Sequence, residues 1–96
     1  MAKNVELLQA KRSVLENLER IKVDLALCIQ DGLSDPSGTD YNEILDLIED
    51  AKIIDNWDDL NEAVVRAKTL EIEIAGWLAR HGRTSVSFSW PKKANP

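Results

Sequence analysis

Residues 7–31, LLQAKRSVLENLERIKVDLALCIQD, form the longest uninterrupted helical pattern in this chain. Apolar residues recur there at the three- and four-residue intervals that place them on one face of an α-helix: Leu7, Val14, Leu18, Ile21, Leu25 and Cys28. No glycine or proline interrupts the stretch, and the pattern reaches back to about Lys3, so we expect one helix of about 28 residues and roughly 42 Å. Val23 and Leu27 point away from the main face, which predicts that the second half of this helix is covered on more than one side.

A shorter helix is expected next. The stretch DGLSDPSG at residues 31–38 ends the first helix, since Gly32 suits a C-terminal cap and Pro36 cannot continue a helix comfortably. Asp40 or Thr39 then caps a second helix, and Glu43 follows Asp40 at the capping-box spacing. The apolar face of this helix predicts an end near residue 54.

The third expected helix is long again. Asn56 is its predicted N-cap, basic side chains fall in its last turn, and Gly82 is its predicted C-terminal cap. Its apolar face comprises Trp57, Leu60, Val64, Ala67, Leu70, Ile74, Trp77 and Leu78.

The sequence therefore predicts an all-α fold, a three-helix antiparallel bundle of one long, one short and one long helix over residues 1–82. We expect the two long helices to lie antiparallel along their whole length. The short helix then covers only part of the groove between them, and apolar surface is left over.

Residues 83–96 form an expected extended C-terminal tail. In it Val86, Phe88 and Trp90 alternate with serines, the two-residue period of extended backbone. Burying such side chains contributes about 1.5 to 3 kcal/mol each, so exposing all three would be costly. In the first alternative the tail packs on its own bundle or against a second copy of the chain. In the second it docks on another protein. A disordered tail is the third alternative.

The charge is concentrated in the middle of the chain. Residues 31–62 carry eleven acidic side chains and one basic side chain, whereas the whole 96-residue chain has a net charge of −5. Nucleic-acid binding depends on clustered Lys and Arg, so we expect no direct contact with DNA or RNA. Within the block, Asp46, Glu49 and Asp50 lie on the face opposite Ile44 and Ile48. They form either a solvated face or a surface that meets a basic partner.

One carboxylate spacing points to an enzyme class. Glu16-x-x-Glu19 is followed after 23 residues by Glu43-x-x-Asp46, which resembles the E-x-x-E and E-x-x-D signature of the all-α nucleoside triphosphate pyrophosphohydrolases. The resemblance implies that the four carboxylates hold Mg²⁺ against the phosphates of a nucleotide. The helical pattern, however, points Glu16 and Glu19 away from the core, so this enzyme is the lesser alternative.

The remaining composition favours a small single domain without a cofactor. One cysteine and one histidine do not make a zinc site, and no apolar run reaches the length of a membrane span or of a secretion signal. We expect a cytoplasmic, non-catalytic protein-protein interaction or regulatory module, a homodimer, that binds a protein partner through the acidic residues Asp46, Glu49 and Asp50 or through the tail. The alternative is an acidic nucleic-acid mimic, a phage-type inhibitor of a nucleic-acid-binding protein.

Overall fold

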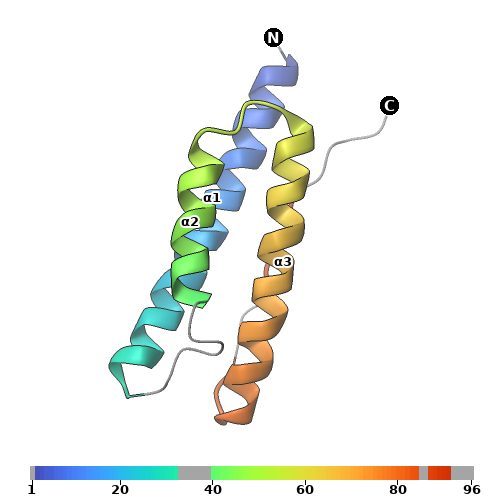
Figure 1. The fold of residues 1–96 in the computed structure, drawn as a ribbon. Helices are drawn as coiled ribbons and strands as arrows, with labels where there is room; N and C mark the ends of the chain where they lie inside the picture. Colours follow the sequence, from blue (N-terminus) through green and yellow to red (C-terminus); the bar gives the residue numbers. More distant parts are fainter. Residues whose placement is uncertain (1, 33–39, 85–86, 92–96) are drawn as a thin grey trace.

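The computed structural model describes residues 2–32, 40–84 and 87–91, and their regular elements are helices α1 (Ala2–Gln30), α2 (Asp40–Lys52) and α3 (Trp57–Arg80). The helices pack side by side into an elongated molecule of 47 × 22 × 16 Å (Figure 1). The prediction of an all-α bundle with one long, one short and one long helix is confirmed. Within the described ranges, no helix has an apolar stretch long enough to cross a membrane.

Consecutive helices run in opposite directions. α2 returns along α1, and α3 turns back again along α2, so α1 and α3 point the same way (Figure 1). The expectation that the two long helices lie antiparallel to each other is therefore wrong. Each of the two connections reverses the chain once, and two reversals restore the original direction.

The ends of the helices follow local backbone chemistry. The Asn56 side-chain oxygen accepts the Asp59 backbone N–H at 2.8 Å, which confirms the predicted N-cap of α3. Gly82 follows α3 with a φ of 71°, a left-handed conformation that costs glycine little. α2 ends at Lys52, earlier than predicted, because the chain tightens there: the Ile53 N–H bonds back only three residues, to the Asp50 carbonyl.

The core lies where the three helices meet. α1 contributes the face predicted from its three- and four-residue spacing, α2 contributes four apolar side chains, and α3 contributes nearly its whole predicted stripe. The largest fully buried apolar side chains are Val14, Leu18, Leu25, Ile44, Leu47 and Leu60. Cys28 is buried among them as a free thiol, as its position on the α1 face predicted.

The second half of α1 is not covered on two sides within the chain. Val23 and Leu27 are 48% and 54% exposed, so the expectation that they are covered is wrong for a single copy. α2 and α3 both pack against the opposite side of α1. Among the described residues, no fourth helix is present to cover its back.

Candidate interaction surfaces

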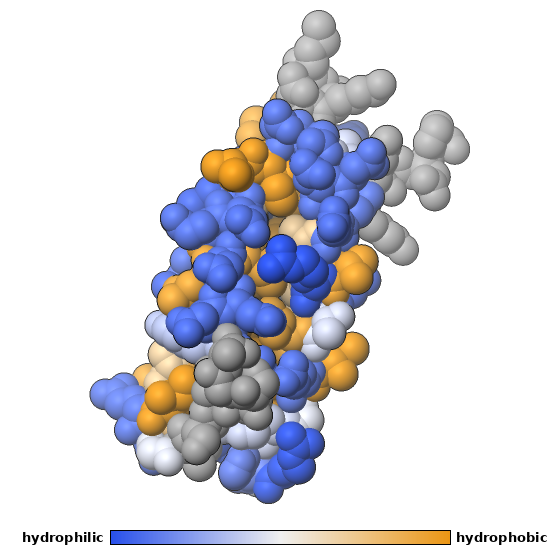
Figure 2. All heavy atoms as spheres, viewed as in Figure 1, coloured by the Kyte–Doolittle hydropathy of each residue, from blue (hydrophilic) through white to orange (hydrophobic). Residues whose placement is uncertain are grey.

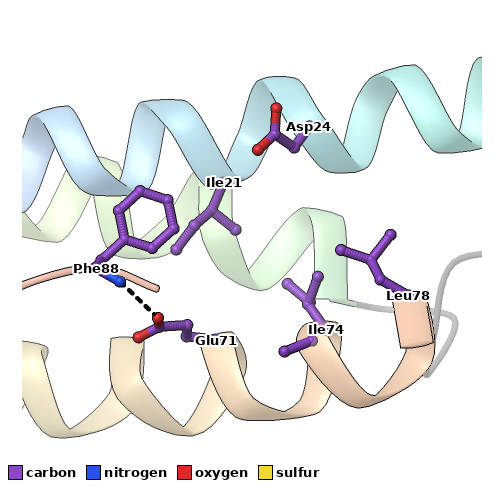
Figure 3. A pocket seen from close by; sticks show the side chains of 7 residues that line it. Ile21, Asp24, Glu71, Ile74, Leu78 and Phe88 are labelled. Carbon is purple, nitrogen blue, oxygen red and sulfur yellow. Dashed lines mark hydrogen bonds between the residues drawn. The ribbon is translucent and has the colours of Figure 1, made fainter. Parts of the chain in front are cut away.

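The tail packs on its own bundle. Residues 87–91 lie in the groove between α1 and α3, which Figure 3 shows with α2 behind it. Phe88 and Trp90 are partly buried against the core, while Ser87 and Ser89 are exposed, which is the predicted alternation. Val86 lies outside the described residues.

Among the described residues, two polar side chains bind residues 88–90 of the tail. The Glu71 carboxylate on α3 accepts the Phe88 backbone N–H at 3.0 Å with Oε2 and the Trp90 indole N–H at 2.7 Å with Oε1. From α1, the Asn17 side-chain amide donates to the Ser89 carbonyl at 2.8 Å. Three consecutive tail residues are thereby fixed from both walls of the groove. Hydrogen bonds to a carboxylate are the stronger kind, so Glu71 is the main polar contact.

A small pocket lies beside the Phe88 ring. Its lining comes from both long helices and the tail (Figure 3): Ile21, Asp24, Glu71, Ile74, Ala75, Leu78 and Phe88. The Phe88 and Trp90 rings lie 6.1 Å apart between centroids and are tilted by 50°. The two rings therefore shield this part of the α1–α3 groove as one aromatic pair.

Sequence reasoning missed Glu71 and Asn17. A signal was available, because Val64, Glu71 and Leu78 are seven residues apart and the acid interrupts an otherwise buried column. A lone polar residue in such a column needs a partner if it is partly buried. The sequence could have marked Glu71 as paired, although not with which atoms.

The three acids predicted to bind a partner are exposed together on α2. Asp46, Glu49 and Asp50 form what we call the acidic face. Glu49 pairs with Lys52 at 2.8 Å, and the hydrogen bond from Lys52 to Glu49, followed by the charge of Glu49, raises the pKa of the Lys52 ammonium. Asp50 pairs with Arg66 of α3 at 3.5 Å. Both pairs are exposed to solvent, where water and salt screen an ion pair, so they do not fix the side chains of this face in place.

An open hollow adjoins the acidic face where α2 ends and α3 begins. It is lined by Asp50, Ile53, Ile54, Asp59, Glu62, Ala63 and Arg66. Ile53 is 81% exposed, so a large apolar side chain stands among carboxylates. Figure 2 shows the α2–α3 side of the molecule, where hydrophilic residues surround separate apolar patches.

The four carboxylates of the pyrophosphohydrolase pattern all lie exposed on the surface of α1 and α2: Glu16, Glu19, Glu43 and Asp46. Over the described part of the chain, the structure does not gather three or more His, Cys, Asp or Glu side chains into a group that could hold a metal ion.

The two predicted surfaces thus differ in availability. The tail anchors Phe88 and Trp90 are in contact with their own bundle, whereas the acidic face and its hollow are open to solvent. Compared with known proteins, the chain matches no family model, no curated protein and no solved structure.

Proposed function

We propose that this protein is a small non-catalytic binding module whose acidic face, Asp46, Glu49 and Asp50, recruits a basic protein partner. The observation that carries the proposal is the contrast between the two surfaces: the tail is used inside the fold, and the acidic face is exposed. Of the two surfaces that the sequence predicts, only the acidic face can meet a partner without first disrupting the bundle.

The electrostatics of the acidic face support a role outside the fold. Its three carboxylates are three and four residues apart on one helix, where like charges destabilise the helix by a few tenths of a kcal/mol. Within the described residues, Lys52 and Arg66 offset them through exposed contacts. An unfavourable concentration of charge is explained if it steers a basic partner and sets its orientation.

The hollow beside the acidic face supplies the apolar part of such a contact. Interfaces typically combine an apolar centre with a polar rim, and Ile53 flanked by Asp50 and Asp59 has that arrangement on a small scale. A basic partner with one apolar anchor would satisfy both parts.

The test compares partner capture by three forms of the full chain. The neutralised variant carries Asp46→Asn, Glu49→Gln and Asp50→Asn. The control carries Glu6→Gln in α1, Asp31→Asn just after α1 and Glu73→Gln in α3, which together remove the same amount of negative charge. We expect a basic protein to be captured by the wild type and the control at low salt and lost from the neutralised variant. Calorimetry with the purified partner should then show affinity that falls steeply with salt. Equal capture by all three forms would overturn the proposal.

A nucleic-acid mimic is the second candidate, and one observation favours it. All seven acidic side chains of residues 46–62, from the middle of α2 to the first turns of α3, are exposed: Asp46, Glu49, Asp50, Asp55, Asp58, Asp59 and Glu62. The deciding measurement is competition. If the captured partner binds nucleic acid and the chain displaces a labelled duplex or single strand from it, the chain acts as a mimic; if both bind at once, it acts as a recruiting module.

A further inference from the structure

The back of α1 carries an apolar and charged surface that the bundle does not use. We define the outer face of α1 by the exposed residues on the side opposite its core stripe, Val5, Leu8, Arg12, Glu16, Glu19 and Val23, together with the half-buried Leu15 and Ala26 at its edge, of which Leu15 also packs against the core. Val5 and Leu8 are 50% and 62% exposed, and Val23 is exposed to a similar degree. A shallow hollow on this face is lined by Leu8, Lys11, Arg12, Leu15, Glu16 and Glu19.

The order of residues along the outer face is close to self-complementary when it is reversed. Reversal about the point between Leu15 and Glu16 brings position 8 opposite 23, position 12 opposite 19 and position 5 opposite 26. Leu8 then meets a valine, and Arg12 meets a glutamate. Apolar residues face apolar residues at both ends, opposite charges face each other nearer the centre, and Leu15 faces Glu16 at the axis itself.

We propose that the outer face of α1 binds the same face of a second copy of this chain, with the two α1 helices antiparallel about a two-fold axis between Leu15 and Glu16. Such a contact is isologous, so each favourable pair occurs twice. The contact extends from residue 5 to residue 26, roughly 32 Å of helix at 1.5 Å per residue. The proposed dimer contact shares no residue with the acidic face of α2. It is therefore independent of whether that face binds a basic partner.

The charges select the antiparallel arrangement over the parallel one. Side-by-side parallel copies would place Arg12 against Arg12 and Glu19 against Glu19, which is repulsive. Among the described residues, neither Arg12 nor Glu16 has a salt bridge within the chain, so both are available to a second copy. Glu19 is 3.0 Å from Lys22, an exposed contact that a second copy can share.

The first test exchanges charges across the proposed interface. Arg12→Glu would set two glutamates against each other at each charged pair, and Glu19→Arg would set two arginines, so each variant alone should dimerise about tenfold or more weakly than the wild type. A mixture of the two variants restores both ion pairs and should form the heterodimer. Glu62→Arg on α3 makes the same charge change as Glu19→Arg off the interface and should leave dimerisation unchanged. Solution mass by light scattering over about a thousandfold range of concentration measures each case.

The second test fixes the register with cysteines. Leu8→Cys and Val23→Cys are placed opposite each other between copies, although they lie about 22 Å apart along one helix. A mixture of the two variants should therefore form a covalent dimer under mild oxidation, because a disulfide needs Cβ atoms about 3.5 to 4.5 Å apart. Neither variant alone should do so, nor should the wild type, whose Cys28 is buried.

Three results would overturn the proposal. A monomeric wild type over the whole concentration range would exclude the dimer. A dimer that survives both single charge exchanges would place the interface elsewhere, and cross-linking of Leu8→Cys alone would show a different register. Leu8→Ser, compared with Val65→Ser on α3, guards against a folding artefact: both side chains are exposed, circular dichroism should show both variants folded, and only the first should lose the dimer.

Discussion

At the scale of single residues, Glu71 shows how one side chain can join two parts of the chain. Its two carboxylate oxygens accept from two different tail groups, a backbone N–H of Phe88 and the indole N–H of Trp90. A carboxylate is suited to this because it offers only acceptors, and both groups that face it are donors. Without the tail, Glu71 would be a partly buried acid in an apolar groove.

The substitution Glu71→Gln should weaken this contact. The amide keeps one acceptor oxygen and turns an NH₂ group toward a donor, so one of the two hydrogen bonds is lost. We expect the free energy of unfolding to fall by about 1 to 2 kcal/mol, because the bonds are charge-assisted but partly exposed to solvent. Urea unfolding measures the change. Glu62→Gln, on the exposed side of α3, is the matched control, and equal stability of the two variants would contradict this role of Glu71.

The sequence predicts residues whose partners are local and misses residues whose partners are distant. Asn56 could be identified as a cap because its partner, the Asp59 N–H, lies three residues away in any helix that begins there. Glu71 could not be assigned its role, because Phe88 and Trp90 reach it only after the chain has reversed direction. The same limit explains why the acidic face was found from spacing alone while the contact between Asn17 and Ser89 was not.

At the level of the elements, the tail covers part of the apolar surface that a fourth helix would cover in a larger bundle. α2 has 13 residues and covers one side of the α1–α3 pair, and the described tail residues cover the groove seen in Figure 3. The alternation of Phe88 and Trp90 with serines was readable in the sequence. The surface that the two aromatic rings would cover could not be predicted. α1 and α3 are apolar on adjacent faces, so several grooves would have accepted the rings.

Removal of the tail should therefore destabilise the bundle. A chain that ends at Thr84 keeps the end of α3 but exposes Ile21, Ile74 and Leu78 in the groove. Because two aromatic side chains lose partial burial, we expect a loss of about 2 to 4 kcal/mol in the free energy of unfolding. Thermal and urea unfolding of the shortened and full chains measure the loss. The full chain with Ser87→Ala and Ser89→Ala is the control, since both serine side chains are exposed, and an unchanged midpoint in the shortened chain would refute the structural role of the tail.

At the scale of the whole molecule, the fold combines near and distant contacts. Neighbouring helices in the sequence are neighbours in space, which keeps most loop closures short and favours fast folding. The tail is the exception, because the hydrogen bond from Asn17 to Ser89 joins residues 72 positions apart. Closing so long a loop costs entropy that the few tail contacts recover only after the bundle has formed.

The order of these events can be measured through Trp90→Ala. If the tail docks after the bundle forms, this substitution should speed unfolding and leave the folding rate nearly unchanged, with about a tenfold faster unfolding rate for each 1.4 kcal/mol lost. Stopped-flow mixing with urea gives both rates. Leu18→Ala, a buried position in α1, should in contrast also slow folding if α1 takes part in the transition state. A slower folding rate in Trp90→Ala would mean that the tail is part of the folding nucleus.

The hydrogen bond between Trp90 and Glu71 also gives the chain an optical signal of its own. Trp57 lies at the start of α3, Trp77 is buried near its end, and Trp90 alone sits in the tail. The emission of an indole moves to longer wavelength when water replaces a protein environment, so a shift that vanishes in a Trp90→Phe chain belongs to the tail. Undocking of the tail can therefore be followed in the native protein without any attached dye.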